Sequence, residues 1–233
     1  MTRYFASIGD HILRFDTDAL WAGMWLVLHL QAVESGKLRS PRLIDLQADL
    51  TVEIGTGDAD RPGGGVAWAS NGRHARIVAA DESALERAVT QAYGSYVVRC
   101  EWGLLLHAEP LWMSAVCALS AGESDGLALV RIRGGEPLVY DPPFGGGLRT
   151  DAARRPLPLS AVHWLCRPGQ TDIGLAAPAE AAARLRRIAV AADRGGTAPM
   201  KLAWLCRKLA ERVPMYEPSP APPQGCGLKD SIR

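Results

Sequence analysis

The residues of this chain that could take part in phosphate chemistry lie in one central stretch. A turn of small residues, Ser120 to Ser124, follows an apolar run from Ala115 to Leu119 and precedes a second one from Leu127 to Ile132. A third apolar run ends at Tyr140-Asp141. Strand, tight loop, apolar segment and a strand ending in Asp is the order of a phosphate-binding unit, in which backbone N–H groups point at phosphate oxygens.

The loop departs from the usual phosphate-binding pattern at its decisive position. That pattern is G-x-x-x-x-G-K-[ST], in which Lys reaches the outer phosphates and Ser or Thr holds Mg²⁺. The candidate cofactor-binding residues are Gly122, Glu123, Ser124 and Asp125, so that Glu123 takes the place of the Lys. Two unit charges about 4 Å apart interact by roughly 4 kcal/mol at an effective dielectric of about 20. Replacing attraction by repulsion therefore predicts the loss of ordinary nucleotide binding.

Two local structures fit the residues after the loop. Leu127 to Arg133 can form a short helix that is capped at Asp125, or the first strand of a hairpin that turns at Gly134-Gly135. The β-branched side chains of Val130 and Ile132 favour the strand. In the hairpin there is no helix N-terminus to bind phosphate.

Length, charge and cysteine content restrict the class of protein. The 233 residues suit one large domain or two small ones. The 26 Lys and Arg against 25 Asp and Glu give a net charge of +1, so no global field attracts nucleic acid or an anionic membrane. The five cysteines show no C-x-x-C pairing, which indicates reduced thiols, no metal site and a cytoplasmic protein. No apolar segment is long enough to span a bilayer.

The hydrophobic pattern predicts an α/β (α+β) fold in two lobes. Residues 1–98 are expected to form a small mixed lobe, 99–216 a lobe with a central sheet flanked by helices, and 217–233 a flexible tail. The sheet of the second lobe is expected to contain the segments around Leu104, Val116, Leu138 and Val162. The expected strands cover 4–8, 12–15, 49–54, 66–70, 74–79, 158–166 and, as a last edge strand, 213–216. The expected helices cover 19–34, 179–193 and 200–212, and one more opens at 81–83.

The helix over 19–34 has recognisable signals at both ends. Asp16 to Asp18 can cap its start, and Gly36 can close it. Trp21, Trp25, Leu28 and Ala32 share one face at helical spacing, which predicts a core stripe.

The order of these parts resembles that of the HPr kinase-like family, specifically the relatives found with peptide natural-product (lasso-type) pathways. The matching segments are Leu104 to Ala108, Ala121-Gly122-x-Ser124, Leu138 to Asp141, Pro156 to Val162 and Val213 to Tyr216. The resemblance implies that the second lobe is a P-loop domain with a degenerate loop. It also implies that His107 and Asp141 are the catalytic residues, with Asp141 as the base for a substrate hydroxyl. These two side chains are then expected within roughly 10 Å of each other, about one Debye length.

Two functions follow from the resemblance. The first is a non-catalytic or impaired relative that needs no cofactor and binds a peptide or a partner enzyme in a peptide-tailoring pathway. The second is an active kinase that uses ATP and Mg²⁺ on a peptide or protein hydroxyl. In that kinase Arg131, Arg133 or Arg149 replaces the missing Lys, since Arg grips phosphate bidentately.

A third hypothesis does not involve phosphate. It is a cysteine-dependent enzyme that uses Cys117 or Cys166 with His107 or His163, although apolar strands disfavour the thiolate that such chemistry needs. No nucleic acid and no membrane are expected as partners, and the sequence leaves the oligomeric state open.

Overall fold

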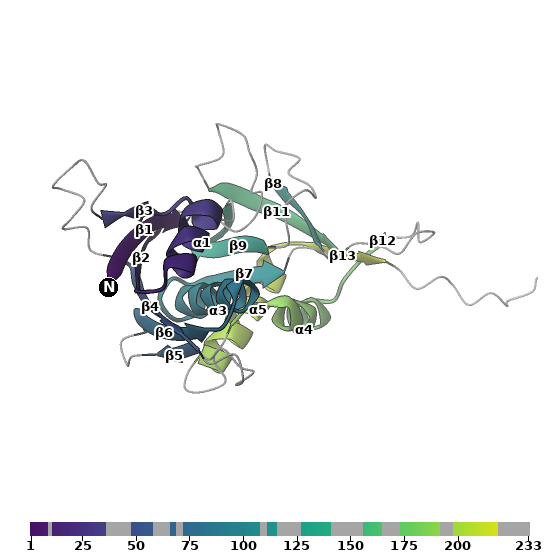
Figure 1. Ribbon diagram of the computed structural model, residues 1–233. Helices are drawn as coiled ribbons and strands as arrows, with labels where there is room; N and C mark the ends of the chain where they lie inside the picture. Colours follow the sequence, from purple (N-terminus) through teal and green to yellow (C-terminus); the bar gives the residue numbers. More distant parts are fainter. Residues whose placement is uncertain are drawn as a thin grey trace, which may run out of the picture.

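The computed structural model describes residues 1–8, 11–35, 48–57, 66–68, 72–107, 111–115, 127–140, 156–164, 173–191 and 198–218. Within these ranges the fold is mixed α/β, with two mixed sheets and four helices (Figure 1). This confirms the predicted combination of sheets and helices. The predicted arrangement of lobes and the P-loop stays a prediction.

The first sheet is built from the N-terminal strands. They are β1 (Thr2–Ile8), β2 (His11–Thr17), β3 (Val33–Glu34), β4 (Leu50–Thr56), β5 (Val66–Trp68) and β6 (His74–Ala79), in the order β3-β1-β2-β4-β6-β5. β1 pairs antiparallel with β2, and β5 pairs antiparallel with β6. The strands β2, β4 and β6 run parallel, which the sequence pattern did not reveal.

Two helices pack on the apolar face of this sheet. They are α1 (Leu20–Leu30) and α3 (Glu82–Cys100). The start of α3 is as predicted, because the Asp81 side chain accepts a hydrogen bond from the backbone N–H of Ala84 at 2.7 Å. In Figure 1, α3 lies in the middle of the molecule, between the first sheet and the C-terminal helices.

The helix α1 differs from its prediction at both ends and in its buried face. The N-cap residue is Ala19, which has no capping side chain, although the Thr17 hydroxyl of the predicted capping segment accepts a hydrogen bond from the Ala19 N–H at 3.1 Å. The helix ends at Leu30, where Gln31 turns with φ +51. The early end lets the chain add β3 to the edge of β1. Leu28 was expected in the core stripe but is 72% exposed. The buried residues of α1 are Ala22, Gly23, Trp25, Leu26 and Leu30.

The second sheet contains the segments that the sequence singled out for chemistry. Its strands are β7 (Gly103–His107), β8 (Leu111–Ala115), β9 (Leu127–Arg133), β10 (Glu136–Tyr140), β11 (Leu157–Trp164), β12 (Ile173–Leu175) and β13 (Met215–Pro218). The order is β12-β13-β11-β10-β9-β7, with β8 beside β11. The segments of Leu104, Leu138 and Val162 therefore share a sheet as predicted, while Val116 lies outside the described residues.

The strand β13 corrects a prediction about the end of this sheet. It was expected at an edge but lies between β12 and β11, and it runs parallel to β11. The register places Met215 beside Val162. Because both side chains are buried, β13 is part of the core and not an edge strand beside it.

The C-terminal helices are α4 (Pro178–Ile188) and α5 (Ala198–Arg212). α4 ends five residues before its predicted end at 193, because the chain then forms a bridge between Ala189 and Leu106. The N–H of Val190 also donates to the carbonyl of Leu105 at 2.7 Å. These contacts cover the outer edge of β7, which would otherwise expose unpaired backbone groups.

The two apolar clusters formed by the described residues share α3. One contains Tyr93 and Tyr96 of α3 with the first sheet and also Leu105 and Leu129 of the second sheet. The other contains Val98 with the opposite face of β7 and with α4 and α5. Apolar packing therefore crosses the predicted boundary near residue 98, and that boundary stays a prediction.

Candidate functional site

The strand ends of the second sheet bring together the segments that were expected to form a phosphate site. His107 is the last residue of β7, is exposed, and pairs in register with Leu127, the first residue of β9. At the same end of the sheet, Tyr140 closes β10 and pairs with Leu129. Because neighbouring strands are about 4.8 Å apart, β10 lies roughly 10 Å from β7.

The other predicted site residues lie outside the described residues. These are Gly122, Glu123, Ser124, Asp125 and Asp141. The structure therefore places His107 and the residue before Asp141 near one end of the sheet, two strands apart and two residues apart in register, or roughly 12 Å. The expected approach of His107 to Asp141 stays a prediction.

The segment after the loop is a strand, so the hairpin interpretation is confirmed and the helix interpretation is wrong. β9 pairs with β10 on one edge and with β7 on the other. The turn consists of Gly134 at φ +57 and Gly135 at φ +90, the combination of positive φ angles that tight hairpins prefer. Val130 and Ile132 pack toward α5, as their β-branched side chains favour in a sheet.

The arginine on the opposite face of β9 is part of a buried polar network. The Arg131 guanidinium forms an ion pair with the Glu101 carboxylate, which also accepts a hydrogen bond from the Tyr96 hydroxyl at 2.8 Å. His11 lies with Nε2 3.4 Å from the same carboxylate and with Nδ1 3.0 Å from the Tyr93 hydroxyl. The network therefore joins β2, α3 and β9 at the centre of the molecule.

The hydrogen bonds and charges of the network determine the protonation of Glu101 and Tyr96. Burial alone would raise the pKa of Glu101, but the Tyr96 hydrogen bond and the charges of His11 and Arg131 hold it below its ordinary value. Burial and the neighbouring Glu101 carboxylate raise the pKa of Tyr96. Glu101 is therefore an anion that stays paired within the protein. Sequence reasoning did not find this network, since no pattern links His11 to residues more than eighty positions away.

The arginines proposed as substitutes for the Lys have different surroundings. Arg131 is 4% exposed and its guanidinium also lies 5.3 Å from the centroid of the Tyr140 ring. Arg133 is exposed, with its guanidinium 5.9 Å from the same ring, and Arg149 lies outside the described residues. Since Arg131 is already paired with Glu101, only the other two remain candidates for an altered phosphate site.

The thiols of the described residues are poorly suited to nucleophilic chemistry. Burial raises the pKa of Cys100, and it raises the pKa of Cys206 to about 12. Cys117 and Cys166, named in the cysteine-enzyme hypothesis, lie outside the described residues. Their proposed partner His163 is stacked on Tyr216 with ring centroids 4.8 Å apart.

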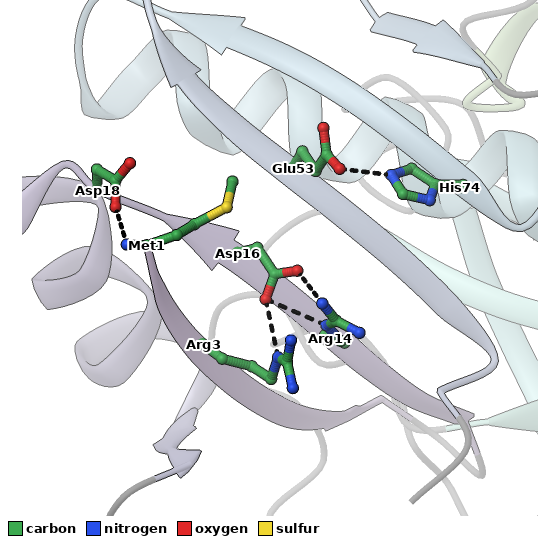
Figure 2. Close-up of polar contacts among 7 residues, drawn as sticks. All are labelled: Met1, Arg3, Arg14, Asp16, Asp18, Glu53 and His74. Atoms are coloured by element: carbon green, nitrogen blue, oxygen red, sulfur yellow. Dashed lines mark hydrogen bonds and ion pairs between the residues drawn. The ribbon is translucent and has the colours of Figure 1, made fainter.

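The outer face of the first sheet carries a second group of charges (Figure 2). Asp16 accepts hydrogen bonds from Arg3 at 3.2 Å and from Arg14 at 3.1 Å. Burial would raise the pKa of Asp16, but these arginines lower it below its ordinary value. On the next strand Glu53 pairs with His74 at 3.0 Å. These charges neutralise one another across the sheet.

A shallow hollow of about 380 Å³ adjoins this face, where β2 and β4 end. Its lining includes Asp18, Glu53, Thr56 and Arg76, and Asp18 forms an ion pair with the amino group of Met1. Carboxyl ends of parallel strands are a common place for ligands in open sheets. The lining carries both signs of charge, so it selects no class of ligand.

The described residues contain no group of three or more His, Cys, Asp or Glu side chains placed to hold a metal ion. None of the helices in the described ranges is both long enough and apolar enough to cross a membrane. No protein-family model matches the chain, and no curated protein sequence matches it.

Proposed function

We propose that this chain is a non-catalytic HPr kinase-like protein that binds a peptide or a partner enzyme in a peptide-tailoring pathway. The observation that carries the proposal is that the residues after the loop form the strand β9, and not the helix whose N-terminus a phosphate-binding unit uses. Glu123 at the position of the phosphate-binding Lys supports it from the sequence.

The strand argues against phosphate binding because of its hydrogen bonds. A phosphate cradle depends on unpaired backbone N–H groups at the start of a helix. β9 pairs with β7 over Leu127 to Arg131 and with β10 over Leu129 to Arg133, so most of its N–H groups point at a neighbouring strand. The residues after the loop therefore offer no row of free donors to the β- and γ-phosphates of a nucleotide.

The alternative function is an ATP-dependent kinase with an altered site. One observation favours it: His107, the start of β9 and the end of β10 lie at a common end of the second sheet. The missing cation is expected to be Arg133 or Arg149; Arg133 is exposed but is the last residue of β9, at the opposite end of that strand from Leu127, and Arg149 lies outside the described residues. This kinase would hold Mg²⁺ through Ser124 and would use Asp141 as the base.

Calorimetric titration with ATP, with and without Mg²⁺, separates the two functions. We expect no binding heat in either condition. A dissociation constant in the micromolar range would overturn the proposal and support the kinase.

The variant Glu123→Lys makes the test sharper. If the loop were a damaged cradle, replacing repulsion by attraction should restore affinity, and ATP with Mg²⁺ should raise the melting temperature of the folded variant. Because β9 is a strand, we expect no such rise. The control is Glu136→Lys, which makes the same charge change at an exposed residue of β10. A rise that occurs in Glu123→Lys alone would show that the loop binds phosphate.

A further inference from the structure

The outward face of α5 is strongly basic. It carries Lys201, Arg207, Lys208 and Arg212 against a single acid, Glu211. The Glu211 carboxylate lies 2.7 Å from Lys208 and 3.9 Å from Arg207. α5 itself therefore carries four cations and one acid, a charge of +3 (four minus one), in a chain whose net charge is only +1.

Two tryptophans lie within this basic surface. Trp204 of α5 meets Trp102 edge to face, with ring centroids 5.3 Å apart. Trp102 is 51% exposed, and the Lys201 ammonium lies 4.4 Å from the centroid of its ring. The same ammonium donates to the carbonyl of Arg99 at 2.6 Å, which fixes its position over the ring. We call Trp102, Lys201, Trp204, Lys208 and Arg212 the basic–aromatic face.

The backbone of Trp102 is in a conformation that bulky residues rarely adopt. Its φ is +53, in the left-handed region, where glycine is the favoured residue. The following Gly103 packs tightly, since a Cβ there would lie 2.7 Å from side-chain atoms of Val97 and Arg131. A large aromatic side chain that is both strained and half exposed contributes little to the core. Strained residues of this kind gather at binding sites.

We infer that the basic–aromatic face is the docking surface for an acidic segment of a partner protein or peptide. Charge complementarity selects the acidic segment, because its carboxylates can pair with Lys208 and Arg212. The exposed ring of Trp102 and the adjoining Trp204 offer a site for one apolar or aromatic side chain of that segment.

A protein or peptide fits this face better than a nucleic acid does. The Lys201 ammonium covers one side of the Trp102 ring, so a base cannot stack there.

The inference rests on the proposed function for the expectation that a partner exists, but it uses none of the residues of the predicted nucleotide loop. The probe is a short labelled peptide of glutamates around one phenylalanine, titrated into the full chain by fluorescence anisotropy. The same peptide with lysines in place of glutamates, and a single-stranded oligonucleotide, are the comparison probes. Nucleotide titration, described above, tests the other proposal separately.

The expected result is saturable binding of the acidic probe that weakens as salt is added. The double variant Lys208→Glu with Arg212→Glu should weaken the binding of the acidic probe at least about tenfold. Arg87→Glu, an exposed charge reversal roughly 18 Å from Arg99 along α3, is the matched control and should change it less than about twofold. Trp102→Gly, which suits the positive φ and should fold well, should also weaken binding.

Several results would contradict the inference that the basic–aromatic face is a docking surface. They are no binding of the acidic probe, equal weakening by Arg87→Glu, or tighter binding of the oligonucleotide or the lysine peptide. If the folded Trp102→Gly variant binds the acidic probe with unchanged affinity, the Trp102 ring does not contribute to the docking surface. If the acidic probe binds as expected and ATP also binds, the proposed function fails while the docking surface stands.

Discussion

Removing Arg131 should destabilise the protein strongly, and the loss should depend on pH. Arg131 is 4% exposed and its guanidinium neutralises the Glu101 carboxylate, so Arg131→Met leaves a partly buried anion beside Tyr96 and His11. Breaking one side of a buried ion pair costs about 3–5 kcal/mol. Because Glu101 keeps two partners and some contact with water, we expect about 3 kcal/mol, the lower end of that range.

The direction of the pH dependence follows from the pKa of Glu101. In the native protein this pKa is lowered, so the carboxylate contributes stability above its unfolded pKa, and that stability is lost as pH falls through the folded value. Without Arg131 the folded pKa of Glu101 rises, and protonation then relieves the unpaired charge. The cost of Arg131→Met should therefore be largest near neutral pH and smaller in acid.

Urea denaturation at neutral pH and at a pH near the unfolded pKa of glutamate, about 4.3, measures both effects. The control is Arg133→Met on the same strand, where the side chain is exposed and the expected cost is below about 1 kcal/mol. The double variant Arg131→Met with Glu101→Gln should recover part of the loss. A cost that is equal at both pH values, or no larger than that of the control, would refute this account of the network.

Three further predictions concern single contacts, each measured by urea denaturation at neutral pH. Gly94→Ala should cost about 3 kcal/mol, because the added Cβ would overlap the carbonyl oxygen of Val190; a cost below about 1 kcal/mol would contradict this packing. Asp81→Ala should cost about 1 kcal/mol by removing the cap of α3, and an unchanged midpoint would count against the cap. Asp16→Asn should lower the free energy of unfolding by about 1 kcal/mol, and by less at high salt. This loss should shrink as pH falls through the lowered pKa of Asp16. A loss that is independent of pH and salt would argue against the ion pairs.

The parts of the fold that were predictable are those with local signals. The hairpin of β9 and β10 follows from two glycines between β-branched runs, and the start of α3 follows from Asp81. The end of α1 was missed because Gln31, not a glycine, adopts the positive φ. That choice depends on the pairing of β3 with β1, which links residues about thirty positions apart and leaves no local signal.

The candidate site was predictable only in part, for a similar reason. Glu123 and the β-branched residues of β9 argue against a phosphate cradle from the sequence alone. The ion pair of Glu101 with Arg131 joins residues of different elements, and the spacing of these residues in the sequence does not predict it. The basic residues of α5 are visible at helical spacing, but the position of Trp102 beside Trp204 follows from packing between α3 and α5.

The sharing of α3 by both apolar clusters has a consequence for how the protein unfolds. A fragment that ends at Cys100 would lose Leu105, Leu129 and Tyr140 from the cluster that covers its own helix. A fragment that begins at Gly103 would lose Val98 and the support of α3 behind β7. Neither half keeps a complete apolar core, so the two sheets should melt together in a single cooperative transition, and limited proteolysis should release no stable half.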